Sequence, residues 1–229
     1  MILSDPEWQA VMLSLKVSSI AVLFSLPFGI LVAWILVRCR FPGKSVLDSI
    51  IHLPLVLPPV VVGYLLLIGL GRRGVIGQYL YDWFGFSFAF SWRGAALASA
   101  VIAFPLMVRA IRLALEAVDM RLEQAARTLG AGRWRVFFTI TLPLTLPGII
   151  VGTVLAFARS LGEFGATITF VSNIPQETRT LPLAMFTLIE TPGAEGAAAR
   201  LCVIAIALAL LSLMISEWLA RWGRKRMGA

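Results

Sequence analysis

Five long apolar runs constrain what this chain can fold into. They cover residues 9–37, 46–70, 94–115, 136–158 and 200–220. A helix needs about 20 apolar residues to cross the hydrocarbon core of a bilayer, and each run reaches that length. Of the 229 residues, 59% are apolar and 14% are charged, whereas about a quarter of a soluble domain is charged. The sequence therefore predicts an all-α, polytopic membrane protein with five transmembrane helices in a single domain over residues 1–229.

The same residues exclude several other classes of protein. The sequence lacks the succession of ten-residue segments with alternating polarity that is typical of a membrane β-barrel. The two cysteines, Cys39 and Cys202, are too few for a disulfide framework. A single histidine, His52, leaves too little material for a metal site, so we expect neither a metal nor a cofactor. An acidic start with Asp5 and Glu7 is unlike a cleavable signal peptide, which begins with a basic segment.

The placement of lysine and arginine predicts the orientation. One side of the predicted spans carries 13 of the 20 basic residues and five of the 12 acidic ones, while the other side carries seven of each. Because lysine and arginine are enriched in cytoplasmic loops, the N-terminus is predicted outside and the C-terminus in the cytoplasm. The net charge of +8 thus reflects orientation, and no nucleic-acid partner is expected. The cytoplasmic basic residues are Arg38, Arg40, Lys44, Arg109, Arg112, Arg121, Arg127, Arg133, Arg135, Arg221, Arg224, Lys225 and Arg226.

The segment over residues 116–135, which joins the third and fourth spans, is predicted to be cytoplasmic. Four residues in it recur at helical spacing and form a narrow apolar stripe on a charged helix. These residues are Leu122, Ala125, Ala126 and Leu129. Gly130 and Gly132 are expected to end this helix, and a second helix begins at Arg133 and runs into the fourth span. The pattern indicates a docking site for another protein; the alternative is an ordinary basic loop that holds the orientation.

This segment resembles the "EAA" loop of permease subunits in binding-protein-dependent ABC importers. The matching residues are Gln124, Ala125, Ala126, Gly130, Ile140, Leu142 and Pro143. The first position of the family's pattern is usually acidic, whereas this chain has Gln124 there and Glu123 just before it. The separate roles of these two residues therefore stay open. The resemblance implies short coupling helices that sit in a cleft of a cytoplasmic ATPase subunit. The residues expected to couple to that ATPase are Glu123, Gln124, Ala125, Ala126, Gly130 and Arg133.

The resemblance extends to permeases for tetrahedral oxyanions, and it is closest to the molybdate permeases. It rests on residues 38–44, 53–63, 125–131 and 159–166. Sulfate and thiosulfate permeases share much of the pattern but are usually longer, with an additional N-terminal span. The resemblance implies two copies of the chain in the inner membrane, in contact with lipid, two ATPase subunits inside and a periplasmic oxyanion-binding protein outside. We therefore expect import of molybdate from periplasm to cytoplasm, with sulfate, thiosulfate or tungstate as the alternatives.

The chain is expected to supply a gated conduit and no catalysis. Gly43-Lys44-Ser45 is not a phosphate-binding loop, because the glycine required five positions earlier is Arg38. One histidine and two distant cysteines do not supply the nucleophile–base pair or metal ligands that a membrane-embedded enzyme needs. An ion-coupled secondary transporter would need carboxylates or broken helices near the membrane centre, usually in repeated halves. No second half resembles the first, and the acidic residues fall at span ends.

Three residues of the fourth span are candidates for the transport pathway or its outer mouth. Arg159 and Glu163 are four residues apart near the outer end, so both side chains can face one way. Thr153 supplies a hydroxyl within the span. The alternatives are a structural ion pair at the interface and a threonine that bonds only its own helix backbone.

Three further features concern packing, shape and contact with a partner. Gly148 and Gly152 predict close helix packing, with either the same chain or a second copy. Prolines 54, 58 and 59 predict a bend in the second span, either a static kink or a point of rearrangement. A short surface helix over 181–189, together with residues 71–93, is expected to receive the binding protein.

Overall fold

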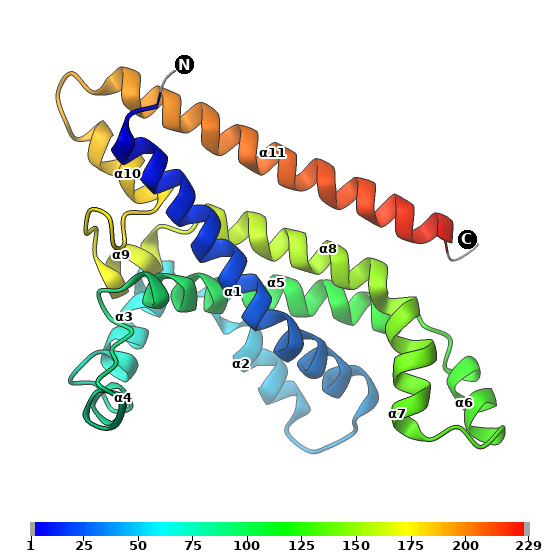
Figure 1. Ribbon diagram of the computed structural model, residues 1–229. Helices are drawn as coiled ribbons and strands as arrows, with labels where there is room; N and C mark the ends of the chain where they lie inside the picture. The colour runs from blue at the N-terminus through cyan, green and yellow to red at the C-terminus, as the bar shows by residue number, and fades with distance from the viewer. Residues whose placement is uncertain (1–2, 227–229) are drawn as a thin grey trace.

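The computed structural model describes residues 3–226, so residues 1–2 and 227–229 of the predicted domain lie outside the described part. Within it every regular element is a helix, which confirms the all-α prediction. The elements are α1 (Asp5–Arg38), α2 (Lys44–Val56), α3 (Pro59–Leu70), α4 (Gly77–Phe84), α5 (Trp92–Glu116), α6 (Met120–Thr128), α7 (Arg133–Val136), the π-helical η1 (Phe137–Thr141), α8 (Leu142–Leu161), α9 (Gly165–Val171), α10 (Leu181–Ile189) and α11 (Glu195–Arg226) (Figure 1).

Four helical stretches are long and apolar enough to cross a membrane. They are α1, α5, the run Arg133–Leu161 that contains α7, η1 and α8, and Glu195–Leu219 of α11. The second predicted span differs, because α2 and α3 meet at an angle of 115° instead of forming one helix. Pro58 and Pro59 explain the break: proline lacks the amide hydrogen that a continuous helix needs, whereas at the start of a new helix none is required. The bent pair brings the possible spans to five.

Helix α5 is the centre of the bundle. It packs most extensively against α8 and α1, and the side chains of Ile102, Met107 and Ile111 are fully buried there. Small residues allow the close approach: Cβ atoms on Gly148 and Gly152 of α8 would press on α5 of the same chain. The pair therefore mediates packing within one chain, which answers the question that the spacing alone left open.

The end of the bundle that holds α3, α9 and α10 is tied together by short contacts. A Cβ on Gly63 of α3 would lie 2.6 Å from the carbonyl oxygen of Ala166 in α9, so only glycine permits this crossing. The Ser14 hydroxyl of α1 accepts a hydrogen bond from the amide of Leu181 at 2.6 Å. Helix α10 covers Leu181–Ile189, the range predicted for the short helix.

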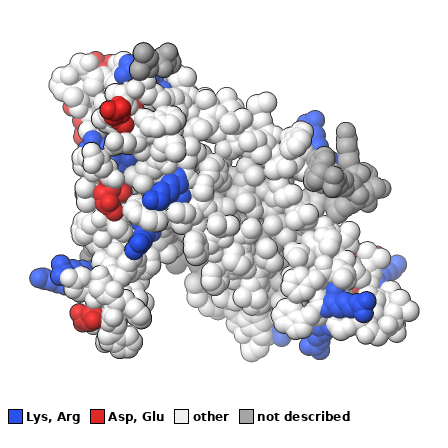
Figure 2. Space-filling model, viewed as in Figure 1, with Lys and Arg blue, Asp and Glu red and all other residues white. Residues whose placement is uncertain are grey.

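Charged side chains gather at the two ends of the bundle. Figure 2 shows an uncharged face between these ends, over the middle of the bundle. The end opposite α3, α4, α9 and α10 carries α6 and α7, which project beyond the bundle (Figure 1). The segment over residues 116–135, which was predicted to be a docking site, therefore lies at this end.

Candidate functional site

Helix α6 is a short helix with defined ends. The Asp119 carboxylate accepts a hydrogen bond from the Arg121 amide at 2.9 Å and caps the first turn. After Thr128 the chain reverses at Gly130, whose φ of +85° lies in the left-handed region that favours glycine. Helix α7 then begins at Arg133. The predicted break at the two glycines, Gly130 and Gly132, is thus confirmed.

The apolar stripe of α6 faces away from the rest of the chain. Leu122 is 49% exposed and Leu129 is 88% exposed, and Ala125 between them is exposed as well. Ala126 is half-buried. In contrast, the carboxylate residue Glu123 is 5% exposed and points inward. This polarity is the reverse of a normal surface helix, which buries its apolar face.

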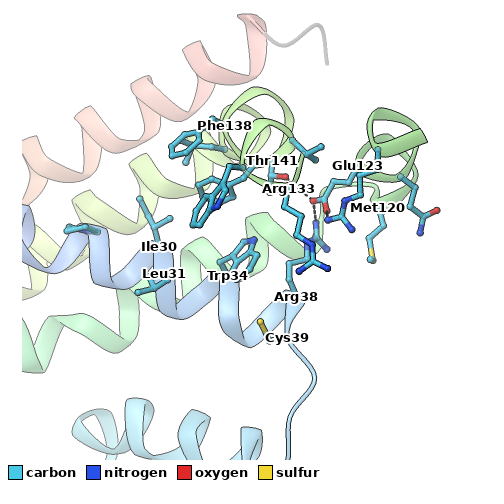
Figure 3. Close-up of a pocket in the computed structure, with 17 residues that line it drawn as sticks. Ile30, Leu31, Trp34, Arg38, Cys39, Met120, Glu123, Arg133, Phe138 and Thr141 are labelled. Atoms are coloured by element: carbon cyan, nitrogen blue, oxygen red, sulfur yellow. Dashed lines mark hydrogen bonds and ion pairs between the residues drawn. The ribbon is translucent and has the colours of Figure 1, made fainter. Parts of the chain in front are cut away.

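Glu123 holds α6 against two other elements. Its Oε1 accepts a hydrogen bond from Arg38 Nη2 at 2.7 Å and another from the Thr141 hydroxyl at 3.0 Å (Figure 3). Arg38 is the last residue of α1 and Thr141 is the last residue of η1. Arg127 lies 4.0 Å from the other carboxylate oxygen. Glu123 is therefore an anchor for the helix, whereas the neighbouring Gln124 is exposed.

The anchor partners were not identified as site residues from the sequence. Arg38 was noted as a cytoplasmic charge, and Thr141 was only one of several threonines on and near the fourth span. The sequence signal for the anchor is weak: Glu123 lies to one side of the apolar stripe, about 100° around the helix from Leu122. Thr141 also closes a π-helical segment, a local widening of the helix that is frequent at functional sites.

A cavity of about 800 Å³ lies between the end of α1, helix α6 and the start of the fourth span. Three of the predicted coupling residues, Glu123, Gln124 and Arg133, line it, while Ala125, Ala126 and Gly130 do not (Figure 3). Within residues 3–226 no cluster of three or more His, Cys, Asp or Glu side chains is arranged to hold a metal ion.

The three pathway candidates lie on or just after α8, toward the other end. Arg159 Nη1 and a Glu163 carboxylate oxygen are 2.8 Å apart, and the Glu163 side chain is 1% exposed. Glu163 also accepts a hydrogen bond from the Ala166 amide at 2.9 Å, which caps the first turn of α9. The Thr153 hydroxyl donates to the Ile149 carbonyl at 2.7 Å within its own helix. These contacts fit the structural alternatives, which are a stabilising ion pair and a threonine that bonds only its own helix backbone.

Comparison with known proteins gives a family for this architecture. Residues 25–228 match the family "Binding-protein-dependent transport system inner membrane component". The chain is 81% identical over 228 residues to the "Molybdenum transport system permease protein ModB" of Escherichia coli (strain K12), covering 100% of both chains. It is 36% identical over 231 residues to the "Sulfate transport system permease protein CysT" of the same organism, covering 99% of this chain and 82% of CysT.

Among solved structures, an inward-facing form of the MetNI methionine ABC transporter shares the fold. The TM-score is 0.74 at 16% sequence identity, and the match covers 96% of this chain and 99% of that one. The likeness in fold agrees with the sequence match, which extends from α1 to the end of α11. The chain belongs to the family of inner-membrane components of binding-protein-dependent transport systems.

Proposed function

We propose that this chain is the permease subunit of an ATP-driven ABC importer that carries molybdate from the periplasm into the cytoplasm. We infer the substrate from the 81% identity, over the full length, to a molybdenum transport permease. Sulfate is supported less well, because identity to the sulfate permease is 36% and 18% of that longer chain is unmatched. The chain supplies the conduit, and a separate subunit hydrolyses ATP.

The proposed contact with the ATPase subunit is the outward stripe of α6. Leu122, Ala125 and Leu129 are apolar and uncovered, and they lie on a helix that projects beyond the bundle. Exposed apolar residues that gather on one face mark sites of protein contact. Gly130 belongs to this contact because it turns the chain directly after the stripe. Apart from its two neighbours in the chain, no residue in the described part has an atom within 4 Å of the position of a Cβ there.

Gly130→Asp tests the docking of the ATPase. Aspartate tolerates the left-handed backbone better than most residues, so its added charge and bulk act mainly on the partner. Gly43→Asp is the matched control, because Gly43 has a φ of +86°, open space around it and a place between α1 and α2. We expect Gly130→Asp to abolish uptake into proteoliposomes and to lose the ATPase subunit during purification. Normal transport by that variant would refute docking at this bend.

Deletion of the gene tests the substrate. Cellular molybdenum should collapse in trace molybdate and recover only when external molybdate is high, with or without excess sulfate. Unchanged molybdenum together with a new requirement for a sulfur source would instead assign the chain to sulfate. Competition with tungstate in the same uptake assay measures how far the intact importer separates these two similar anions.

The proposed orientation places α6 in the cytoplasm and the N-terminus in the periplasm. It can be tested in a variant in which Cys39 and Cys202 are replaced by serine. An impermeant maleimide added to intact spheroplasts should label Arg73→Cys, in the connection before α4, and should label Arg40→Cys only after lysis. Both arginines are exposed. The reverse labelling pattern would overturn the orientation.

The functional assembly is proposed to contain two copies of the chain. Helix α2 has no buried residue, and its Val46, Ile50 and Val56 are more than 60% exposed. This apolar face requires a cover, which a second copy and lipid together supply. A detergent-corrected mass of one permease chain per complex would refute the pairing. The periplasmic binding protein is proposed to dock at the opposite end, near α4 and α10.

A further inference from the structure

We propose that the cavity beside α6 binds one anionic phospholipid of the cytoplasmic leaflet. Its headgroup would lie among the arginines at the end of α1 and on α6 and α7, and one of its two acyl chains would run along α1. The inference depends on the orientation proposed above only for the choice of leaflet. It does not depend on the transported substrate.

The charge of the cavity favours an anion. Its charged lining residues are Arg38, Arg127, Arg133 and Glu123, which leaves an excess of two positive charges. The only carboxylate is held at 2.7 Å by Arg38. Arg127 is 53% exposed and 4.0 Å from that carboxylate. Arg133 forms none of the ion pairs found among residues 3–226. Basic pockets between helices on the cytoplasmic side suit anionic lipid headgroups.

Apart from the charged residues, Gln124 and Thr141, the lining consists mostly of large apolar side chains. Ile30, Leu31 and Trp34 of α1 line the cavity together with Phe138 of η1 (Figure 3). Phe137 of η1 lines it as well, and its ring meets that of Trp34 edge to face, with the centroids 6.4 Å apart. Leu31 is 52% exposed and Phe138 is 58% exposed, so the chain itself does not cover this surface. The walls thus offer contacts to a hydrocarbon chain next to the charged rim.

Aromatic residues mark the level of this cavity in the membrane. Trp134 is 77% exposed, and its ring stacks on Phe138 with the centroids 6.5 Å apart. Tryptophan is enriched where headgroups meet hydrocarbon. The arginines at the rim and the exposed tryptophan therefore lie at the level where a lipid phosphate is expected.

The length of the α1 wall matches one leaflet. The lining runs along this helix from Pro27 to Arg38. At 1.5 Å per residue this distance is about 16 Å, and half of the hydrocarbon core is about 15 Å thick. A free oxyanion would use the arginines alone and leave the apolar wall uncovered. A phospholipid uses both parts of the cavity, which is why we assign the cavity to it.

Native mass spectrometry of the intact permease assembly in detergent tests the proposal with two lipids of the same chain length. Phosphatidylglycerol should bind to one site per permease chain, and phosphatidylcholine should bind at least tenfold more weakly. Each arginine near an anionic lipid contributes about fivefold in affinity, so R127Q/R133Q should lose about thirtyfold for phosphatidylglycerol. The matched control is R121Q/R135Q, which removes one exposed arginine from α6 and one from α7 outside the cavity; it should change little.

A second variant tests the apolar wall without changing any charge. Leu31→Trp adds bulk to the cavity at a position that is already half exposed, so folding should be preserved. We expect it to weaken phosphatidylglycerol binding as well.

Two results would overturn the proposal in favour of general surface charge. One is an equal loss of phosphatidylglycerol affinity in R127Q/R133Q and R121Q/R135Q, and the other is equal binding of the two lipids. Displacement of the lipid by inorganic phosphate or molybdate would assign the rim to a free anion. Loss of the dimer in R127Q/R133Q would assign the cavity to the second copy.

Discussion

Replacing Glu123 with glutamine tests how the proposed coupling helix is held. The carboxylate and the Arg38 guanidinium are nearly buried, with 7% and 11% of their side chains exposed. Removing one partner of a buried ion pair costs about 3–5 kcal/mol, because the other charge stays buried without compensation. We take the lower end, since Arg38 ends its helix at the edge of the bundle. A cost of about 3 kcal/mol corresponds to more than a hundredfold change in an equilibrium.

The cost should act locally, on the attachment of α6. This helix has nine residues and few contacts with the rest of the chain besides the anchor, so it can detach while the bundle stays folded. Hydrogen exchange of the amides of α6 should accelerate by about a hundredfold in Glu123→Gln. Exchange in the centre of α5 should be unchanged. Uptake per folded molecule should fall even though insertion and assembly persist.

A double-mutant cycle and a control make the prediction specific. Arg38→Gln with Glu123→Gln removes both charges, so the double variant should exchange more slowly than either single variant. The control is Glu116→Gln, which breaks a 2.9 Å pair with Arg112 whose side chains are 45% and 31% exposed. Such partly exposed pairs contribute about 0–1 kcal/mol. Unchanged exchange in Glu123→Gln, or a double variant with the summed effect of both singles, would refute the anchor.

Three further predictions concern packing and the outer end. Gly148→Val should lower the melting temperature, because its Cβ would overlap the Ala114 side chain and overpacking costs about 1–3 kcal/mol; Gly196→Ala, with open space around it, is the control. Gly63→Val should separate α3 from α9, which a falling cross-linking yield between cysteines placed on the two helices would report. Glu163→Gln decides between the two interpretations of its pair: a structural role predicts lower thermal stability with normal uptake per folded molecule, and a pathway role predicts the reverse.

Much of the architecture was predictable because it depends on local sequence. Apolar runs of the length of a bilayer produced the spans, and the range of α10 follows from an apolar stretch bounded by Thr180 and Glu190. The turn after α6 follows from Gly130, since few other residues adopt its backbone conformation. The prolines predicted a bend between α2 and α3 but not its angle of 115°. The angle depends on the elements against which α3 packs.

Contacts between distant segments could not be predicted in the same way. Arg38 and Glu123 are 85 residues apart in the chain, and the sequence contains many other arginines that could have paired with this carboxylate. Helical spacing defined the apolar stripe of α6 but not the direction in which it points. The same limit applied to Gly148, whose small size predicts a close neighbour without identifying α5 as that neighbour.

The inverted polarity of α6 agrees with the proposed docking of a partner, which places two demands on one short helix. Nine residues are too few to form a stable helix alone in water, so α6 needs contacts to the chain. Burying its apolar stripe would supply them but would leave no surface for a partner. A buried carboxylate with two partners solves this problem: Glu123 attaches α6 through Arg38 of α1 and Thr141 of η1, and the stripe stays free. We infer that a force on the stripe reaches the first and fourth spans together, so that weakening either contact should reduce coupling before it affects the fold.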